Sequence, residues 1–155
     1  MSADEIKIVS ATRAIATEAS MVFELIADPA RQPEWDGNDN LAVAVEGQRV
    51  RSVGDIFSTT LTNEAVRENH VVEFVEGHRI AWTPAEPGKL PAGHLWRWEI
   101  ETVNPGRCIV THTYDWSNLQ DEARFVRARA TTSQWLATSI DRLATLAEAN
   151  TSPDK

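Results

Sequence analysis

Alternating apolar and polar positions predict β-strands through most of the chain. The alternation begins near residue 6 and continues to about residue 15 over a β-branched stretch. It returns in six runs that turn residues separate, at about 40–46, 55–63, 65–75, 78–83, 95–103 and 107–116. The connections between these runs are too short for parallel crossovers, so we expect one curved, mainly antiparallel sheet of seven strands.

Two short helices are expected between the first and second strands. Thr17 is a suitable N-cap, and apolar residues recur at helical spacing from Met21 to Ile26, which predicts a helix ending near Ala27. Asp28-Pro29 combines a capping carboxylate with a proline at the first helical position. A second short helix should therefore begin there and reach about residue 35, before turn-forming residues at 36–40.

A long helix is expected at the C-terminal end. Its apolar face recurs at helical spacing and comprises Trp135, Leu136, Ser139, Ile140, Leu143, Leu146 and Ala147. Thr131 and Gln134 match a capping box, so residues 121–130 form either a separate short helix or a kinked lead-in. The order of elements predicts an α+β fold in which this helix closes over the inner face of the sheet.

Tryptophan is unusually frequent, with six residues against one tyrosine. Strand alternation places Trp96 and Trp98 on one face, and it places His112, Tyr114 and Trp116 in one row of the next strand. A packed core explains any single tryptophan, whereas the set, mixed with histidine and tyrosine, favours a lined cavity. The predicted ligand-binding wall comprises Phe57, Leu61, Trp82, Trp96, Trp98, Trp116, Trp135 and Ser139.

His112 and Tyr114 are the candidate catalytic residues, because they should project side by side into that cavity. Histidine can move a proton near neutral pH, and tyrosine can donate to a developing oxyanion. The alternative is that His112 is a hydrogen-bonded core residue and Tyr114 a wall residue. Glu68 and Glu73 are expected on opposite faces of their strand, so that one of them could also reach the cavity.

Composition narrows the classes of partner. The net charge of −8, with scattered basic residues, disfavours nucleic acid and anionic membrane surfaces, and no apolar segment is long enough for integral membrane association. The first residues lack the pattern of a secretory signal, so we expect a cytoplasmic protein. Histidine spacing indicates no metal site, glycine-rich phosphate loops are absent and Cys108 should be an inert buried thiol, so we expect no cofactor.

The order of these elements resembles the START-like (SRPBCC) helix-grip superfamily, specifically its bacterial polyketide cyclase/dehydrase and lipid-transport family. The matching signposts are Val22-Phe23 through Asp28-Pro29, Pro33 to Asp36, Val53-Gly54-Asp55 with Phe57, Arg79 to Trp82, Trp96 to Trp98, Thr113 to Trp116 and Ser139 to Leu143. The resemblance implies one domain over residues 1–155, with 151–155 as a flexible tail. It also implies a sheet wrapped around the last helix, with a cavity between them for polyketides, lipids or similar metabolites.

Two hypotheses follow for the function. The first is a binding or carrier domain, monomeric or homodimeric, for a small hydrophobic molecule. The second is a cofactor-free polyketide cyclase, aromatase or dehydratase that works in the same cavity. The resemblance carries no catalytic residue to a position in this chain, so His112 and Tyr114 rest on the pattern of the strand alone.

Overall fold

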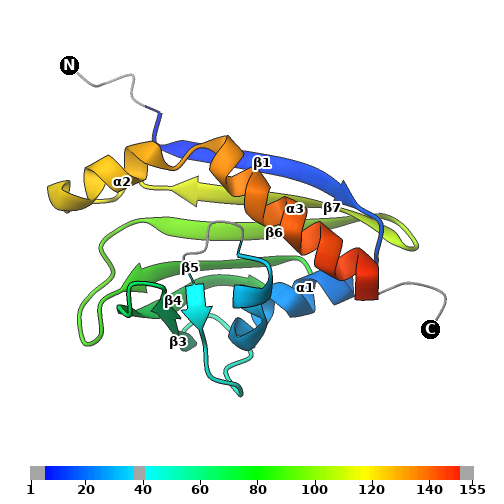
Figure 1. Ribbon diagram of the computed structural model, residues 1–155, viewed down its shortest axis with the longest axis horizontal. Coiled ribbons are helices and arrows are strands. Elements are labelled where there is room, and N and C mark those ends of the chain that lie inside the picture. Colours follow the sequence, from blue (N-terminus) through cyan, green and yellow to red (C-terminus); the bar gives the residue numbers. More distant parts are fainter. Residues whose placement is uncertain (1–5, 37–40, 151–155) are drawn as a thin grey trace.

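The computed structural model describes residues 6–36 and 41–150. Within them, one antiparallel sheet of seven strands has the order β1-β7-β6-β5-β4-β3-β2 (Figure 1). The strands are β1 (Ile8–Ile15), β2 (Leu41–Val43), β3 (Ile56–Leu61), β4 (Val66–Val75), β5 (Arg79–Ala85), β6 (Leu95–Asn104) and β7 (Arg107–Asp115). The predicted sheet is confirmed, although β2 is shorter than expected. Most of the turn expected at 36–40 lies outside the described residues.

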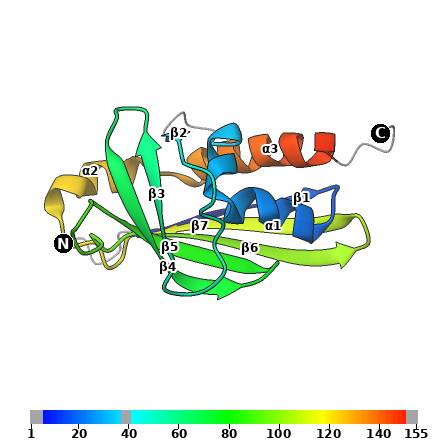
Figure 2. The same ribbon diagram turned by 90° about the horizontal axis from the view of Figure 1, so that it is seen from below.

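The helices are α1 (Ala19–Ala27), the 3-10 helix η1 (Pro29–Glu34), the 3-10 helix η2 (Glu122–Arg124), α2 (Phe125–Ala130) and α3 (Ser133–Asn150). Figure 2 shows α1 and α3 on the same face of the sheet, while α2 lies at the opposite end from α1. The long α3 crosses the sheet and packs against β1 and β7. Residues 121–130 form a separate short helical segment before α3, which confirms one of the two predicted alternatives, and not a kinked lead-in to α3.

Two predicted helix caps were each wrong by one residue. The N-cap of α1 is Glu18, not Thr17, and the Thr17 hydroxyl is buried without a hydrogen-bond partner among the described residues. At α3, the Thr132 hydroxyl accepts from the backbone N–H of Trp135, whereas the Thr131 hydroxyl donates to a carbonyl of α2. Asp28 caps η1 as predicted, through Ala30 N–H.

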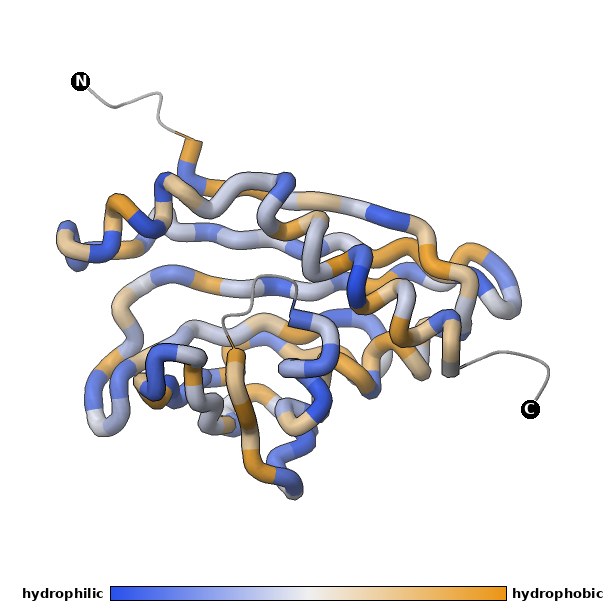
Figure 3. Tube along the Cα trace, viewed as in Figure 1, coloured by the Kyte–Doolittle hydropathy of each residue, from blue (hydrophilic) through white to orange (hydrophobic). Residues whose placement is uncertain are grey.

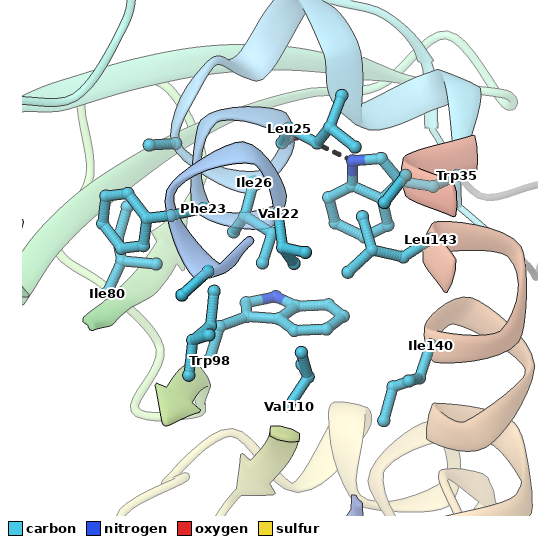
Figure 4. Packing of buried hydrophobic residues seen from close by; sticks show 14 of the residues in the cluster. Val22, Phe23, Leu25, Ile26, Trp35, Ile80, Trp98, Val110, Ile140 and Leu143 are labelled. Atoms are coloured by element: carbon cyan, nitrogen blue, oxygen red, sulfur yellow. Dashed lines mark hydrogen bonds between the residues drawn. The ribbon is translucent and has the colours of Figure 1, made fainter. Parts of the chain in front are cut away.

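Buried and less buried positions alternate along β3 and along the first six residues of β7, so one face of the sheet is turned inward. Figure 3 shows how hydrophobic and hydrophilic residues follow one another along the chain. The largest buried cluster gathers on this face at the end where α1 lies. Trp98 of β6 is 1% exposed and lies between Val110 of β7 and the apolar residues of α1 and α3 (Figure 4). Trp35 meets it edge to face at 5.1 Å and donates its indole N–H to the Leu25 carbonyl at 2.8 Å. This half of the molecule is therefore solidly packed.

The loop between β5 and β6 closes against the segment that follows β7. Gly93 adopts φ +121°, and a Cβ at that position would lie 2.1 Å from the Asn118 carbonyl oxygen. Only glycine allows both this conformation and this approach of two backbones.

We predict that Gly93→Ala lowers the free energy of unfolding by at least about 2 kcal/mol more than Gly88→Ala does. Gly88, in the same loop, also has a positive φ, but a Cβ there would meet nothing within 4 Å. Urea unfolding followed by circular dichroism measures both. Equal losses for the two variants would contradict the close packing at Gly93.

Candidate functional site

A cavity of about 150 Å³ lies under α3, toward α2, and is partly open to solvent. Its floor comes from the inner face of β3 to β7, and its rim comes from η1, β2, η2, α2 and α3. The lining residues are Gln32, Trp35, Asp36, Leu41, Thr59, Leu61, Arg67, Asn69, Trp82, Pro84, His94, Trp96, Trp98, His112, Tyr114, Leu119, Arg124, Arg127, Thr131, Trp135 and Ser139. This wall is mainly apolar and aromatic, with polar groups set among the rings.

A continuous aromatic stack forms one side of the cavity. His112 lies almost parallel to Trp98 at 3.7 Å between ring centroids, and to Trp96 at 5.6 Å. Trp96 also contacts Tyr114 at 4.4 Å and the α3 residue Trp135 at 5.8 Å. The register of β6 and β7 produces this stack, because Trp96 pairs with Tyr114 and Trp98 with His112.

The surroundings of His112 fix its tautomer and its charge. Its Nδ1 lies 3.0 Å from the Arg97 carbonyl oxygen, which can only accept, so Nδ1 carries the proton and Nε2 is an acceptor. Burial lowers the pKa of His112 to about 4, although the bond to Arg97 opposes this shift. The ring is therefore neutral at pH 7, and its basic nitrogen is a weak proton acceptor.

Tyr114 and His94 supply complementary polar groups. Burial raises the pKa of Tyr114 to about 12, so its hydroxyl stays protonated, and it has no hydrogen-bond partner among the described residues. Burial, and then the charges of Arg124, Arg67 and Arg127, lower the pKa of His94 to about 4. The cavity thus offers a neutral acceptor, His112 Nε2, and a neutral donor, the Tyr114 hydroxyl, to a bound molecule.

Comparison with solved structures identifies the architecture. A START superfamily protein from Mycobacterium smegmatis matches with a TM-score of 0.66 and 16% identity, over 93% of this chain and 99% of that chain. The chain has the START-like helix-grip fold. Norcoclaurine synthase from Thalictrum flavum, in complex with dopamine and hydroxybenzaldehyde, matches with a TM-score of 0.62 and 15% identity, over 94% of this chain and 88% of that chain. The Aha1 dimer from Colwellia psychrerythraea matches with a TM-score of 0.57 and 16% identity, over 88% of this chain and 92% of that chain.

Sequence comparison reaches two curated proteins, both uncharacterized, from two strains of Mycobacterium tuberculosis. They are 30% and 31% identical to this chain over 119 and 115 residues, which is 70% of this chain in each case. The match covers 47% of each relative, so this helix-grip chain spans about half the length of the curated proteins that it matches. No protein-family model matches the chain.

The helix-grip fold brings eight of the ten predicted site residues into the cavity wall. These are Leu61, Trp82, Trp96, Trp98, His112, Tyr114, Trp135 and Ser139. The other two are buried beside it. Phe57 packs edge to face against Trp82 at 5.2 Å between ring centroids. Trp116 contacts Phe125 of α2, with the Lys7 and Arg129 side chains over its ring. Neither Phe57 nor Trp116 is among the lining residues.

A β-bulge in β4 corrects the prediction for Glu68 and Glu73. The register shifts between Val71 and Glu73, so residues before and after the bulge follow opposite alternation. Glu73 therefore pairs with Arg97 at 2.7 Å, and Glu68 accepts from Gly88 N–H at 3.1 Å. Neither carboxylate lines the cavity.

Sequence reasoning missed several polar wall residues. Arg67 and Asn69 lie four and two positions before the buried Val71, so the period of β4 places all three on the inner face. That signal was available in the sequence. By contrast, His94, Arg124 and Arg127 come from a loop and short helices, whose side-chain directions the strand pattern does not specify.

The buried neutral state of His112 predicts a pH dependence of stability. Its pKa is about 4 when folded and about 6.5 when unfolded, so as pH falls from about 6.5 to 4 the unfolded state takes up the proton first and stability is lost. We expect His112→Gln to reduce the fall in unfolding free energy between pH 7 and pH 5 by up to about 1.4 kcal/mol per unit.

His78→Gln is the matched control, because His78 is exposed. It should leave the pH dependence of the wild type unchanged. Urea unfolding at each pH provides the measurement, and an unchanged slope in His112→Gln would contradict the buried, neutral assignment.

Proposed function

We propose that this protein binds a compact apolar molecule in the cavity under α3. The supporting observation is the hollow itself, set in a wall of buried aromatic rings. If it were dry, a space of about 150 Å³ would cost up to roughly 4 kcal/mol at about 24 cal/mol per Å³; water can enter this partly open cavity, but an aromatic wall offers it few hydrogen bonds. Occupation by an apolar ligand removes this cost.

The size of the cavity selects the class of ligand. Ligand sites commonly measure about 300 to 1,000 Å³, and an engineered cavity of about 150 Å³ holds benzene. The volume here favours a molecule with one or two rings over a long-chain lipid or an extended polyketide. Norcoclaurine synthase, which shares the fold, is found in complex with two single-ring aromatic molecules.

Binding is favoured over the cyclase or dehydratase alternative by the state of His112. A general base works best with a pKa near the working pH, whereas the pKa of His112 is about 4. The ring instead presents Nε2 as a fixed hydrogen-bond acceptor beside the Tyr114 hydroxyl. This pair suits the recognition of a ligand hydroxyl or carbonyl group, and the remaining wall supplies apolar contact.

Filling the cavity should weaken binding. We predict that phenethyl alcohol changes the tryptophan emission of the wild type saturably, because four indoles of the cavity wall lie within or against the aromatic stack. Ser139→Phe, which places a ring in the cavity from α3, should weaken this binding at least tenfold. Ser139→Leu is the milder second variant.

Thr145→Phe is the control, because Thr145 is exposed on the same helix. It should bind the probe like the wild type. A non-saturable response in the wild type, or equal affinity in Ser139→Phe and Thr145→Phe, would contradict the proposed binding site.

A further inference from the structure

Arginine side chains are concentrated at the α2 end of the cavity. Arg67 comes from β4, Arg124 from η2 and Arg127 from α2, and all three line the cavity. This is unexpected in a chain with a net charge of −8. Placing cations in an apolar wall costs solvation free energy, so a function that uses their charge is the simplest reason for the arrangement.

Arg124 pairs with Glu86 and Asp121, whereas Arg67 forms no ion pair among the described residues. It lies on the inner face of β4, opposite Thr59 of β3 and two residues from Asn69. One guanidinium nitrogen donates to the Val66 carbonyl at 3.0 Å. Burial, and then the positive charge of Arg124, lower the pKa of Arg67, with Glu86 opposing and Arg127 adding to the shift.

The acidic residues nearby are already engaged. Glu86 and Asp121 both pair with Arg124, at 2.8 Å and 3.2 Å. Asp36 also lines the cavity, and its carboxylate accepts from the Leu41 backbone N–H at 2.7 Å. The Arg67 guanidinium therefore retains donors and a positive charge that the surrounding carboxylates do not neutralise.

Neighbouring groups make this end of the cavity suited to a ligand group that accepts hydrogen bonds. The Tyr114 hydroxyl is a protonated donor in the same wall, and His94 beside it is held neutral. The His94 and Tyr114 rings lie 6.1 Å apart. The cavity therefore has an aromatic body, formed by the tryptophans, and one electropositive end.

We propose that the molecule bound in this cavity carries a carboxylate on a compact aromatic body, and that the Arg67 guanidinium binds that carboxylate. A planar guanidinium matches a carboxylate with two parallel hydrogen bonds, and the low-dielectric wall strengthens the pairing. This inference rests on the proposed function, because it names the class of ligand that the same cavity selects.

The test compares two probes of nearly the same shape, the anion phenylacetate and the neutral phenylacetamide. Tryptophan emission gives a dissociation constant for each at low ionic strength. The wild type should prefer the acid by about tenfold or more. Arg67→Gln should reduce this preference to less than about threefold, and Arg67→Lys, which restores the charge without the planar fork, should recover part of it.

Arg79→Gln is the control, because Arg79 is exposed and its partner is Glu99, outside the cavity wall. It should keep the preference of the wild type. Equal affinity of the wild type for acid and amide, or an unchanged preference in both Arg67 variants, would overturn this inference while leaving cavity binding intact. Failure of the acid and the amide to bind, with phenethyl alcohol still bound, would overturn this inference alone, whereas failure of all three probes would overturn the proposed function as well.

Discussion

The stack of His112 on Trp98 divides the space between sheet and helix into two unequal parts. On the α1 side, Trp98 is packed by Val110, Trp35 and the apolar residues of α1 and α3. On the α2 side, the same two rings form a wall of the cavity. The bond from His112 Nδ1 to the Arg97 carbonyl locks the ring in this position. The size of the cavity thus depends on where this stack lies along the sheet.

The position of the stack also determines what the cavity can recognise. Because Nδ1 is committed to Arg97, His112 presents Nε2 to the hollow side as an acceptor, and burial keeps the ring uncharged. The opposite end of the cavity is electropositive, since Arg67 lacks an ion pair there among the residues described. Apolar contact supplies most of the affinity that such a site can offer, while these fixed polar groups orient the ligand.

The sequence predicted those features that follow from strand alternation. Trp96 and Trp98, and likewise His112 and Tyr114, share a face because side chains in a strand repeat every two residues, and the paired strands then place these residues opposite each other. The β-bulge in β4 interrupts this two-residue repeat, so the repeat does not predict the face on which Glu73 lies. The Arg124 and His94 side chains depend on loop and short-helix geometry, and the cavity volume depends on how Trp35 and α1 fill the space beside Trp98. These side-chain directions and the cavity volume depend on how distant segments pack together, and no local sequence pattern predicts them.

No helix among the described residues is long and apolar enough to cross a membrane. The most direct test of the account is a crystal of the protein soaked with para-bromophenylacetate, in which anomalous scattering locates the bromine. The account predicts a bromine peak among Trp82, Trp96 and Trp135, with the carboxylate toward Arg67. A cavity free of ligand density, with bromine only on the outer surface, would contradict it.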